Sequence, residues 1–427
     1  MCSYFCSYTW QFCVSVLLFF VYGRFVVSVT LNSNVRGTSF CEKEKGGGFW
    51  KNIVSFLGSL FRESGMKWTI NVSFLCFLLF GSASGESFHW FQLMGDNQLW
   101  FRFVVEEADV CPKVVVDGVE HLMDQHHAAD GSFPLSCVYK LNLEDLPQSF
   151  IFGNKEILPR FNKDAVTKIA VIGDTGCRNN HFFFPQDCGK EWFFKETVDA
   201  VLKHDPEIVI HVGDYVYREG NRVNSWRTWK EDFFLPAAEL LRSNTPLLLA
   251  RGNHEYCSTG GKGWTYFLGS VKKCLDYEPP YTVSLNGFDI VITDSSIEEK
   301  LCEDIAHIND LNNGKRTWIV THRPLVFKNK KGLYEGNITI FKDLRKEIEL
   351  IMSGHVHVAQ FVRLDGHVQF ISGNSGALLS HWKTANASDS RLEYGFGIID
   401  LLNDNVKITS YDRFNNEMMS VYLSENN

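Results

Sequence analysis

Three apolar segments of this chain each end in a glycine followed by a polar residue, and this arrangement most constrains the fold. They are KIAVIGDTG from Lys168, PEIVIHVGD from Pro206 and PLLLARGNHE from Pro246. The sequences between them, EWFFKETVDAVLKH and WRTWKEDFFLPAAELL, have the apolar spacing of helices. Strands that alternate with helices predict βαβ units around a largely parallel sheet. Because ligands bind beyond the carboxyl ends of such strands, we expect a site where the polar ends meet.

The sequence on either side of these segments predicts further β-structure. Toward the C-terminus, Asn-Gly at 286–287 and Asp-Gly at 365–366 are hairpin turn signals, which indicate mixed or antiparallel pairing. Upstream, short β-branched and aromatic segments such as LWFRFVVEE and KVVVDG predict strands. We therefore predict a small β-sandwich over residues 86–165, followed by an α/β domain over residues 166–427.

Side chains that bind metal ions gather at the predicted strand ends. They are Asp174, Asp214, Tyr217, Asn253, His322, His355 and His357. Carboxylate, phenolate, amide and imidazole groups are ligands for hard or borderline metals, and the lack of cysteine in the set excludes a thiolate site. One such residue alone means little, because an aspartate at a strand end is often a helix cap. Five blocks that each follow an apolar segment favour a metal centre.

The ordered blocks GDTG, GDYVY, GNHE, VTH and GHVH resemble the calcineurin-like metallophosphoesterases. Within them they resemble the purple acid phosphatase branch, whose pattern is DxG, GDxxY, GNHE, VxxH and GHxH. The match covers about residues 167–375, and its one departure is Ile319, which stands where the pattern has valine. The resemblance implies a four-layer αββα sandwich with mixed sheets for the catalytic domain over residues 166–427.

The resemblance also implies a centre with two metal ions. The first ion would be held by Asp174, Asp214, Tyr217 and His357, and the second by Asp214, Asn253, His322 and His355. Asp214 would therefore bridge the two ions. Gly176 stands where other members of the superfamily have a histidine, so one ligand is lost and Tyr217 replaces it. A phenolate is a hard donor that favours Fe(III), while the second ion would be Fe, Zn or Mn.

The expected activity is that of an acid phosphatase, which hydrolyses phosphomonoesters by attack of a metal-bound hydroxide. His254 is expected to face the substrate and to protonate the leaving alkoxide or hold a phosphate oxygen; alternatively it only orients a neighbouring ligand. Arg178, Arg218 and Arg323, with His181, lie beside the blocks and are candidates to contact phosphate, or else surface charges. Three alternatives stay open: a phosphodiesterase for nucleotides or lipid head groups, an inactive secreted binding protein of the same fold, and a membrane-tethered adhesion module.

The N-terminal sequence predicts export. Residues 66–85 have the layout of a secretory signal peptide, with a short apolar core and small residues before Glu86. A second apolar segment at 10–22 is either a membrane anchor or, as we favour, part of an extension over residues 1–65 upstream of the true start at Met66. In both cases we expect the rest of the chain to be secreted, periplasmic or lumenal.

Cysteine content and charge agree with an exported enzyme. Seven cysteines follow Glu86, and an exported chain with this many is expected to carry disulfides. Short loops favour Cys177–Cys188 and Cys257–Cys274, then Cys111–Cys137, with Cys302 left over, although sequence alone does not fix the pairing. The net charge of −8 does not favour binding to nucleic acid or an anionic membrane. We expect a phosphate ester as the partner, no stable membrane partner unless 10–22 is an anchor, and leave the oligomeric state open.

Overall fold

The protein is described by a computed structural model that divides the chain into two units, Met1–Ser84 and Gly85–Asn427. The described residues are 12–21, 24–33, 86–179, 185–218, 224–311, 314–402 and 405–423. In the first unit β1 (Phe12–Val21) pairs antiparallel with β2 (Arg24–Ser33). The expected signal peptide at 66–85 lies outside the described residues. Within the described residues, no helix has the length and apolar content needed to cross a bilayer.

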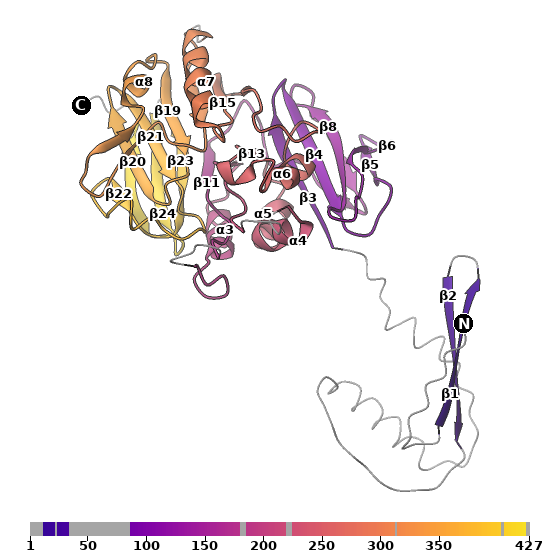
Figure 1. The fold of residues 1–427 in the computed structure, drawn as a ribbon. Coiled ribbons are helices and arrows are strands. Elements are labelled where there is room, and N and C mark those ends of the chain that lie inside the picture. Colours follow the sequence, from indigo (N-terminus) through magenta and orange to yellow (C-terminus); the bar gives the residue numbers. More distant parts are fainter. Residues whose placement is uncertain are drawn as a thin grey trace. The chain divides into compact units, whose positions relative to one another are not determined.

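A sheet of ten strands forms the centre of the second unit (Figure 1). Its order is β25-β24-β23-β11-β12-β13-β3-β4-β8-β7. The strands are β3 (Ser87–Met94), β4 (Gln98–Val105), β7 (Asp124–His127), β8 (Leu135–Asn142), β11 (Lys168–Ile172), β12 (Ile208–His211), β13 (Leu247–Leu249), β23 (Gly395–Leu402), β24 (Asn405–Asp412) and β25 (Glu417–Tyr422). The three segments that the sequence predicts as parallel strands are β11, β12 and β13, and they pair parallel as expected.

A second sheet of seven strands has the order β14-β15-β16-β19-β21-β20-β22. The strands are β14 (Tyr281–Leu285), β15 (Phe288–Ile292), β16 (Thr317–Val320), β19 (Ile348–Ser353), β20 (Ala359–Leu364), β21 (His367–Ser372) and β22 (Ser390–Arg391). The predicted turns at 286–287 and 365–366 join the antiparallel pairs β14–β15 and β20–β21. Both residues of each turn have positive φ, which matches the right-handed twist of the strands.

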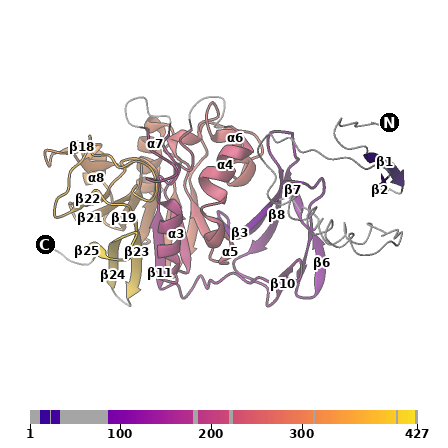
Figure 2. The same ribbon diagram turned by 90° about the horizontal axis from the view of Figure 1, so that it is seen from below.

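The two sheets face each other, and helices cover both outer faces (Figures 1 and 2). Alternate residues of β11 point opposite ways: Ile169 and Val171 enter the core between the sheets, while Ala170 and Ile172 pack under helices. The helices on that side are α3 (Phe194–Leu202), α4 (Trp226–Trp229), η1 (Lys230–Phe234), α5 (Ala238–Arg242) and α6 (Gly261–Phe267). The other side carries α7 (Glu298–Leu311) and α8 (Ile338–Lys342), whose apolar residues pack on the seven-stranded sheet. The predicted four-layer αββα arrangement is confirmed.

The segment WRTWKEDFFLPAAELL does not form one helix. It is divided into α4, the wider turn η1 and α5, with residues 235–237 between η1 and α5 in a turn. Pro236 lies at that break, and because proline has no backbone N–H it cannot continue the hydrogen-bond ladder of a helix.

The β-rich region of residues 86–165 has two layers of strands and belongs to the same compact unit as the rest of residues 85–427. Its outer sheet has the order β10-β9-β5-β6, with β5 (Lys113–Val116), β6 (Val119–Leu122), β9 (Phe150–Phe152) and β10 (Lys155–Glu156). Phe150 of this sheet contacts Phe91 and Phe101 of the ten-stranded sheet at ring distances of 5.8 and 5.0 Å. The inner layer is β3, β4 and β8, which continue the ten-stranded sheet beyond β13 (Figure 2). Residue 165 is therefore no boundary between compact units.

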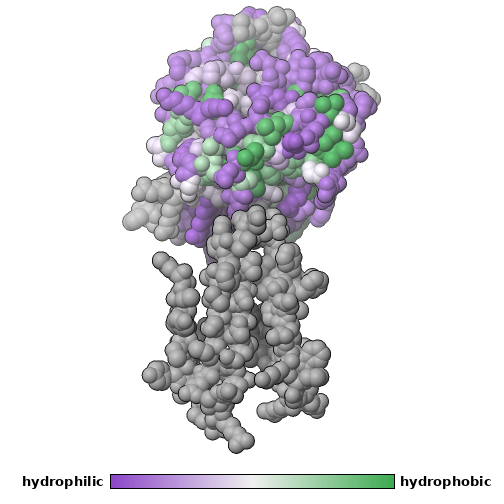
Figure 3. Space-filling model, turned by 90° about the vertical axis from the view of Figure 1, so that its right-hand side faces the viewer, coloured by the Kyte–Doolittle hydropathy of each residue, from purple (hydrophilic) through white to green (hydrophobic). Residues whose placement is uncertain are grey.

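The outer surface at the sandwich end mixes apolar and polar side chains (Figure 3). Val110, Val119 and Leu122 are each more than half exposed there. Such single apolar residues are normal on protein surfaces and need no partner to explain them.

Three disulfides cross-link the second unit, in the pairing that short loops favour. They are Cys111–Cys137, Cys177–Cys188 and Cys257–Cys274, and Cys302 on α7 is free. A short hairpin of β17 (Val326–Lys328) and β18 (Tyr334–Gly336) and the 3-10 helix η2 (Asn253–Glu255) after β13 complete the described elements.

We predict that residues 166–427 do not fold without residues 86–165. Removing β3 takes away Phe88 and Trp90, whose rings pack on Phe234 at 5.2 and 5.6 Å, and exposes the edge of β13. Loss of one such ring costs about 3–5 kcal/mol, against a total stability of about 5–15 kcal/mol. Circular dichroism during heating should show no cooperative transition for 166–427 and a clear one for the control 86–427. A cooperative melt of the shorter chain would show that the sandwich is an independent domain.

Candidate metal centre

The ends of β11 and β12 place two buried aspartates side by side. Asp174 and Asp214 both adopt positive φ, of 53° and 58°, where residues other than glycine are strained. Backbone bonds tie the two loops together, since the N–H of Asp174 donates to the carbonyl of Gly213 at 2.9 Å. A Cβ on Gly252 would overlap the carboxylate and backbone of Asp214, so this glycine permits the close approach of the loop after β13.

Four of the predicted ligands of the first ion converge on one point. The hydroxyl of Tyr217 lies 2.7 Å from Oδ1 of Asp174, 3.0 Å from Oδ2 of Asp214 and 3.0 Å from Nε2 of His357. Nε2 of His357 lies 3.2 Å from Oδ1 of Asp174. All four side chains are buried. The structure thus brings together the four residues that the resemblance implies for the first ion.

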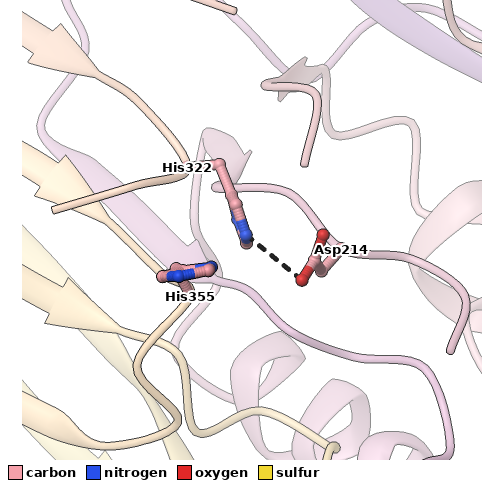
Figure 4. Close-up of side chains that lie close together, drawn as sticks. All are labelled: Asp214, His322 and His355. Atoms are coloured by element: carbon pink, nitrogen blue, oxygen red, sulfur yellow. Dashed lines mark ion pairs between the residues drawn. The ribbon is translucent and has the colours of Figure 1, made fainter. Parts of the chain in front are cut away.

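The predicted ligands of the second ion meet on the other side of Asp214. Nε2 of His322 lies 3.1 Å from Oδ2 of Asp214 and 3.2 Å from Oδ1 of Asn253. One ligand atom each from Asp214, His322 and His355 fits within 4.8 Å. Figure 4 shows the two histidines pointing from the ends of neighbouring strands toward the aspartate. Asp214 is shared by both sets, as the bridging role requires.

Hydrogen bonds on the far side of the rings orient the histidines. Nδ1 of His322 contacts the carbonyl of Val212 at 2.9 Å, and Nδ1 of His357 contacts the carbonyl of Leu378 at 2.6 Å. A carbonyl accepts only from a protonated nitrogen, so each Nδ1 donates, and Nε2 is the ring nitrogen that faces the centre. This is the usual arrangement of histidines that bind metal ions.

The side chains of the centre bring together several buried oxygen atoms that can bind a cation. Burial, together with Asp174 and Asp214, raises the pKa of Tyr217 well above its usual range. Burial also opposes ionisation of Asp214, but the neighbouring His322 and His254 hold its pKa well below the usual range. Buried carboxylate, phenol, amide and imidazole groups at these spacings are the donor set of hard and borderline cations. The residues therefore fit a centre with two metal ions, and a cation beside Tyr217 would favour its phenolate form.

Glu255 has a larger part than its sequence position indicates. Its carboxylate accepts four backbone N–H groups, from Asp214 (3.2 Å), Tyr215 (2.9 Å), Val216 (3.3 Å) and Gly252 (3.1 Å). From the sequence, Glu255 is a weaker candidate than His254 in the GNHE block, with a possible role in orienting a neighbour. Its role depends on backbone groups about 40 residues away, so no local signal reveals it. Glu255 holds the ligand loops after β12 and β13 against each other.

Of the candidate substrate residues, Arg218 is held in ion pairs, whereas Arg323 and Arg178 lie beside proposed metal ligands. Arg218 forms ion pairs with Asp232 at 2.7 Å and Glu231 at 3.0 Å, so its guanidinium is already engaged. Nη1 of Arg323 lies 3.1 Å from Nε2 of His355. The guanidinium of Arg178 lies 5.9 Å from the ring centre of Tyr217.

His254 also borders the centre. Its ring lies 4.4 Å from that of Tyr217, and its backbone N–H donates to Asp214 at 3.0 Å. His181 lies outside the described residues.

The structure also points to a lysine, Lys383, that lies outside the five sequence blocks. Partial burial lowers the pKa of the Lys383 amine, and Arg178 and Arg323 lower it further. The positive charges of these two arginines therefore act on the Lys383 amine. Lys383 lies beyond the last sequence block, where only the fold brings it to the site.

Comparisons with known proteins agree with this geometry. Residues 167–359 match the family model of the calcineurin-like phosphoesterases. The chain carries a calcineurin-like phosphoesterase domain. This match places the domain in the metallophosphoesterase superfamily that the ordered sequence blocks resemble.

Individual relatives are distant from this chain in sequence. The DNA double-strand break repair protein Mre11 of Methanococcus maripaludis is 26% identical over 203 residues, which are 44% of this chain and 50% of that protein. The chain thus spans about half the length of this curated relative. The structure of GAP50, the anchor in the inner membrane complex of Plasmodium, is 12% identical with a TM-score of 0.40, covering 61% of this chain and 89% of its own. That of Vacuolar Protein Sorting 29 from Cryptosporidium parvum is 12% identical with a TM-score of 0.32, covering 61% and 100%.

We predict that Glu255→Ala lowers the free energy of unfolding by more than about 3 kcal/mol. The change leaves four buried N–H groups without their acceptor, and each such group costs about 1–3 kcal/mol. Urea unfolding measures the loss. Glu239→Ala is the matched control, because Glu239 is exposed and forms a surface ion pair with Arg242, so a change of about 0.5 kcal/mol or less is expected. Equal losses in the two variants would contradict the role of Glu255.

Proposed function

We propose that the protein is an exported phosphatase that hydrolyses phosphomonoesters at a centre with two metal ions. The single observation that carries this proposal is the convergence of the Tyr217 hydroxyl on Asp174, Asp214 and His357 within 3.0 Å. The phosphoesterase domain supports the reaction class, which is metal-dependent hydrolysis of a phosphoester. The choice of monoesters and the likeness to purple acid phosphatases rest on the ligand pattern.

The proposed ligands divide as the sequence pattern implies. One ion is held by Asp174, Asp214, Tyr217 and His357, and the other by Asp214, Asn253, His322 and His355. We assign Fe(III) to the Tyr217 site, because a phenolate is a hard donor, and Fe, Zn or Mn to the other. When bound, two such ions neutralise the charge of a phosphate ester and activate water for attack on phosphorus.

The chain's own residues would bind the phosphate and handle the proton. We propose His254 as the catalytic residue, because its ring lies against Tyr217 and is placed to protonate the leaving alkoxide. Arg178 and Arg323 border the centre from two sides and offer charge-assisted hydrogen bonds to phosphate oxygens. We assign Arg218 a structural role, because its ion pairs with Glu231 and Asp232 anchor the loop after β12 to η1.

Three disulfides support export. Disulfides form and persist in oxidising compartments and are rare in the cytosol. We propose that residues 66–85 direct the chain there as a signal peptide and that Glu86 begins the mature protein.

The proposed function predicts rapid release of phosphate from p-nitrophenyl phosphate and much slower release from the bis ester. We expect the monoester to be favoured by at least about tenfold in kcat/KM, and removal of metal by a chelator to abolish turnover. Asp214→Asn should lower turnover to background, because Asp214 belongs to both ligand sets. Turnover of the bis ester alone would support a phosphodiesterase instead. No turnover together with less than about one metal ion per chain would support a binding protein.

We predict that Tyr217→Phe removes the visible absorption band of the iron-loaded protein while the fold survives. The band arises from bonding between the phenolate and Fe(III), and phenylalanine lacks the oxygen. The matched control is Tyr215→Phe, since Tyr215 is equally buried but donates its hydroxyl to the carbonyl of Ala250 at 3.0 Å. Visible absorbance and thermal melting together decide the outcome. A band that persists in Tyr217→Phe and is lost in Tyr215→Phe would overturn the assignment.

A further inference from the structure

The first described residue of the second unit, Glu86, lies opposite another glutamate. The backbone N–H of Glu86 donates to Oε2 of Glu106 at 3.3 Å, and the N–H of Glu106 donates to the carbonyl of Glu86 at 3.2 Å. The two residues face each other one position beyond the β3–β4 ladder, which begins with Ser87 opposite Val105. At this end of β3, the main-chain nitrogen of Glu86 is thus bonded to a carboxylate.

The two glutamates share a single cation. Nζ of Lys230, the first residue of η1, lies 2.5 Å from Oε2 of Glu86 and 2.7 Å from Oε1 of Glu106. Nε1 of Trp226 on α4 also donates to Oε1 of Glu106 at 2.7 Å, but the indole is neutral. Among the described residues, no second cation lies within ion-pair distance of either carboxylate. This cluster of two glutamates and one lysine therefore carries one net negative charge.

The cluster is partly shielded from water. The side chains of Glu86, Glu106 and Lys230 are 39%, 26% and 24% exposed. Burial opposes ionisation of Glu106, but hydrogen bonds from Lys230 and Trp226 hold its pKa below the usual range. Its carboxylate is therefore charged at neutral pH, and partly buried charges are screened less than fully exposed ones. A positive charge on the nitrogen of Glu86 would be stabilised at this position.

We propose that, once the chain is cut before Glu86, Glu106 binds the new α-ammonium group. The cut itself belongs to the export proposed above, on which this inference rests. Hydrolysis adds one water molecule across the Gly85–Glu86 peptide bond: the C–N bond breaks, Gly85 keeps a carboxylate, and the freed amine of Glu86 carries the proton as an ammonium. The contact with Oε2 of Glu106 then becomes a charge-assisted hydrogen bond, and the cluster becomes neutral.

The alternative is that Glu106 only orders the start of β3, whether or not the chain is cut. An amide N–H would then serve as well as an ammonium, and the charge on the nitrogen would have no effect. The reactivity of the terminal amine separates the two explanations. An ordinary chain terminus is partly unprotonated near neutral pH, and only the unprotonated amine reacts with an acylating reagent. An ammonium held by Glu106 should therefore be labelled more slowly.

The experiment produces the chain from Met66, the start favoured above, and from Met1 in cells that secrete it. Mass spectrometry of the purified product should find Glu86 at the N-terminus. The terminal amine is then acetylated near neutral pH, and its labelling rate is read from the N-terminal peptide. We expect Glu106→Gln to be labelled about threefold faster, the effect of losing one ion pair of ordinary surface strength. Glu107→Gln is the matched control, because Glu107 is the next carboxylate along the chain but is exposed, and its rate should equal that of the unmodified protein.

A second measurement decides the outcome if Glu106→Gln does not fold. Acetylation of the Glu86 amine alone, by an N-terminal acetyltransferase, keeps the N–H but removes the charge, and should lower the melting temperature by about 1–3 °C. A mature N-terminus other than Glu86, equal labelling of the unmodified protein and Glu106→Gln, or an unchanged melting temperature overturns the proposal. None of these measurements uses turnover, so a correctly cut but inactive protein would refute the phosphatase function and leave the role of Glu106 standing.

Discussion

The buried carboxylate of Asp214 is the interaction on which the rest of the centre depends. Tyr217 approaches it from one side and His322 from the other, at 3.0 and 3.1 Å. The backbone of Asp214 must be held in place, because a small rotation of its side chain would break the contacts with both Tyr217 and His322. Glu255 holds it by accepting the N–H of Asp214 and those of the two following residues. Burial of this carboxylate among donors is what makes a bound cation favourable there.

The two facing sheets explain why ligands from distant parts of the chain meet. The ten-stranded sheet supplies Asp174, Asp214 and Asn253 from the ends of three adjacent parallel strands. The seven-stranded sheet supplies its histidines from the ends of β16 and β19, which are also adjacent and parallel. A shared apolar core between the sheets keeps these ends together. The strands of residues 86–165 also help to hold this arrangement, because β3 pairs with β13 and extends the sheet that carries the aspartates.

Cationic side chains lie beside the centre, since Arg178 is near Tyr217 and Arg323 is near His355. Arg178, Arg323 and Lys383 come from three different loops, and Trp382 lies beside Arg178. In the proposed phosphatase, the metal ligands would set which bond is attacked, whereas such border groups would set which molecules enter. Reaction class and substrate choice therefore depend on different parts of the chain.

The sequence by itself determined the alternating strands and helices, the hairpin turns at 286–287 and 365–366, and the metal-ligand candidates in their five blocks. These features follow from local periodicity, positive-φ turn residues and donor chemistry, all of which are visible within a few residues. Only the tertiary structure decided that the β-sandwich joins the central sheet, that Glu255 secures two ligand loops, and that Arg218 pairs with buried Asp232. It also brought Lys230 beside Glu86 and Glu106. Each of these depends on contacts between segments far apart in the chain, which no local pattern encodes.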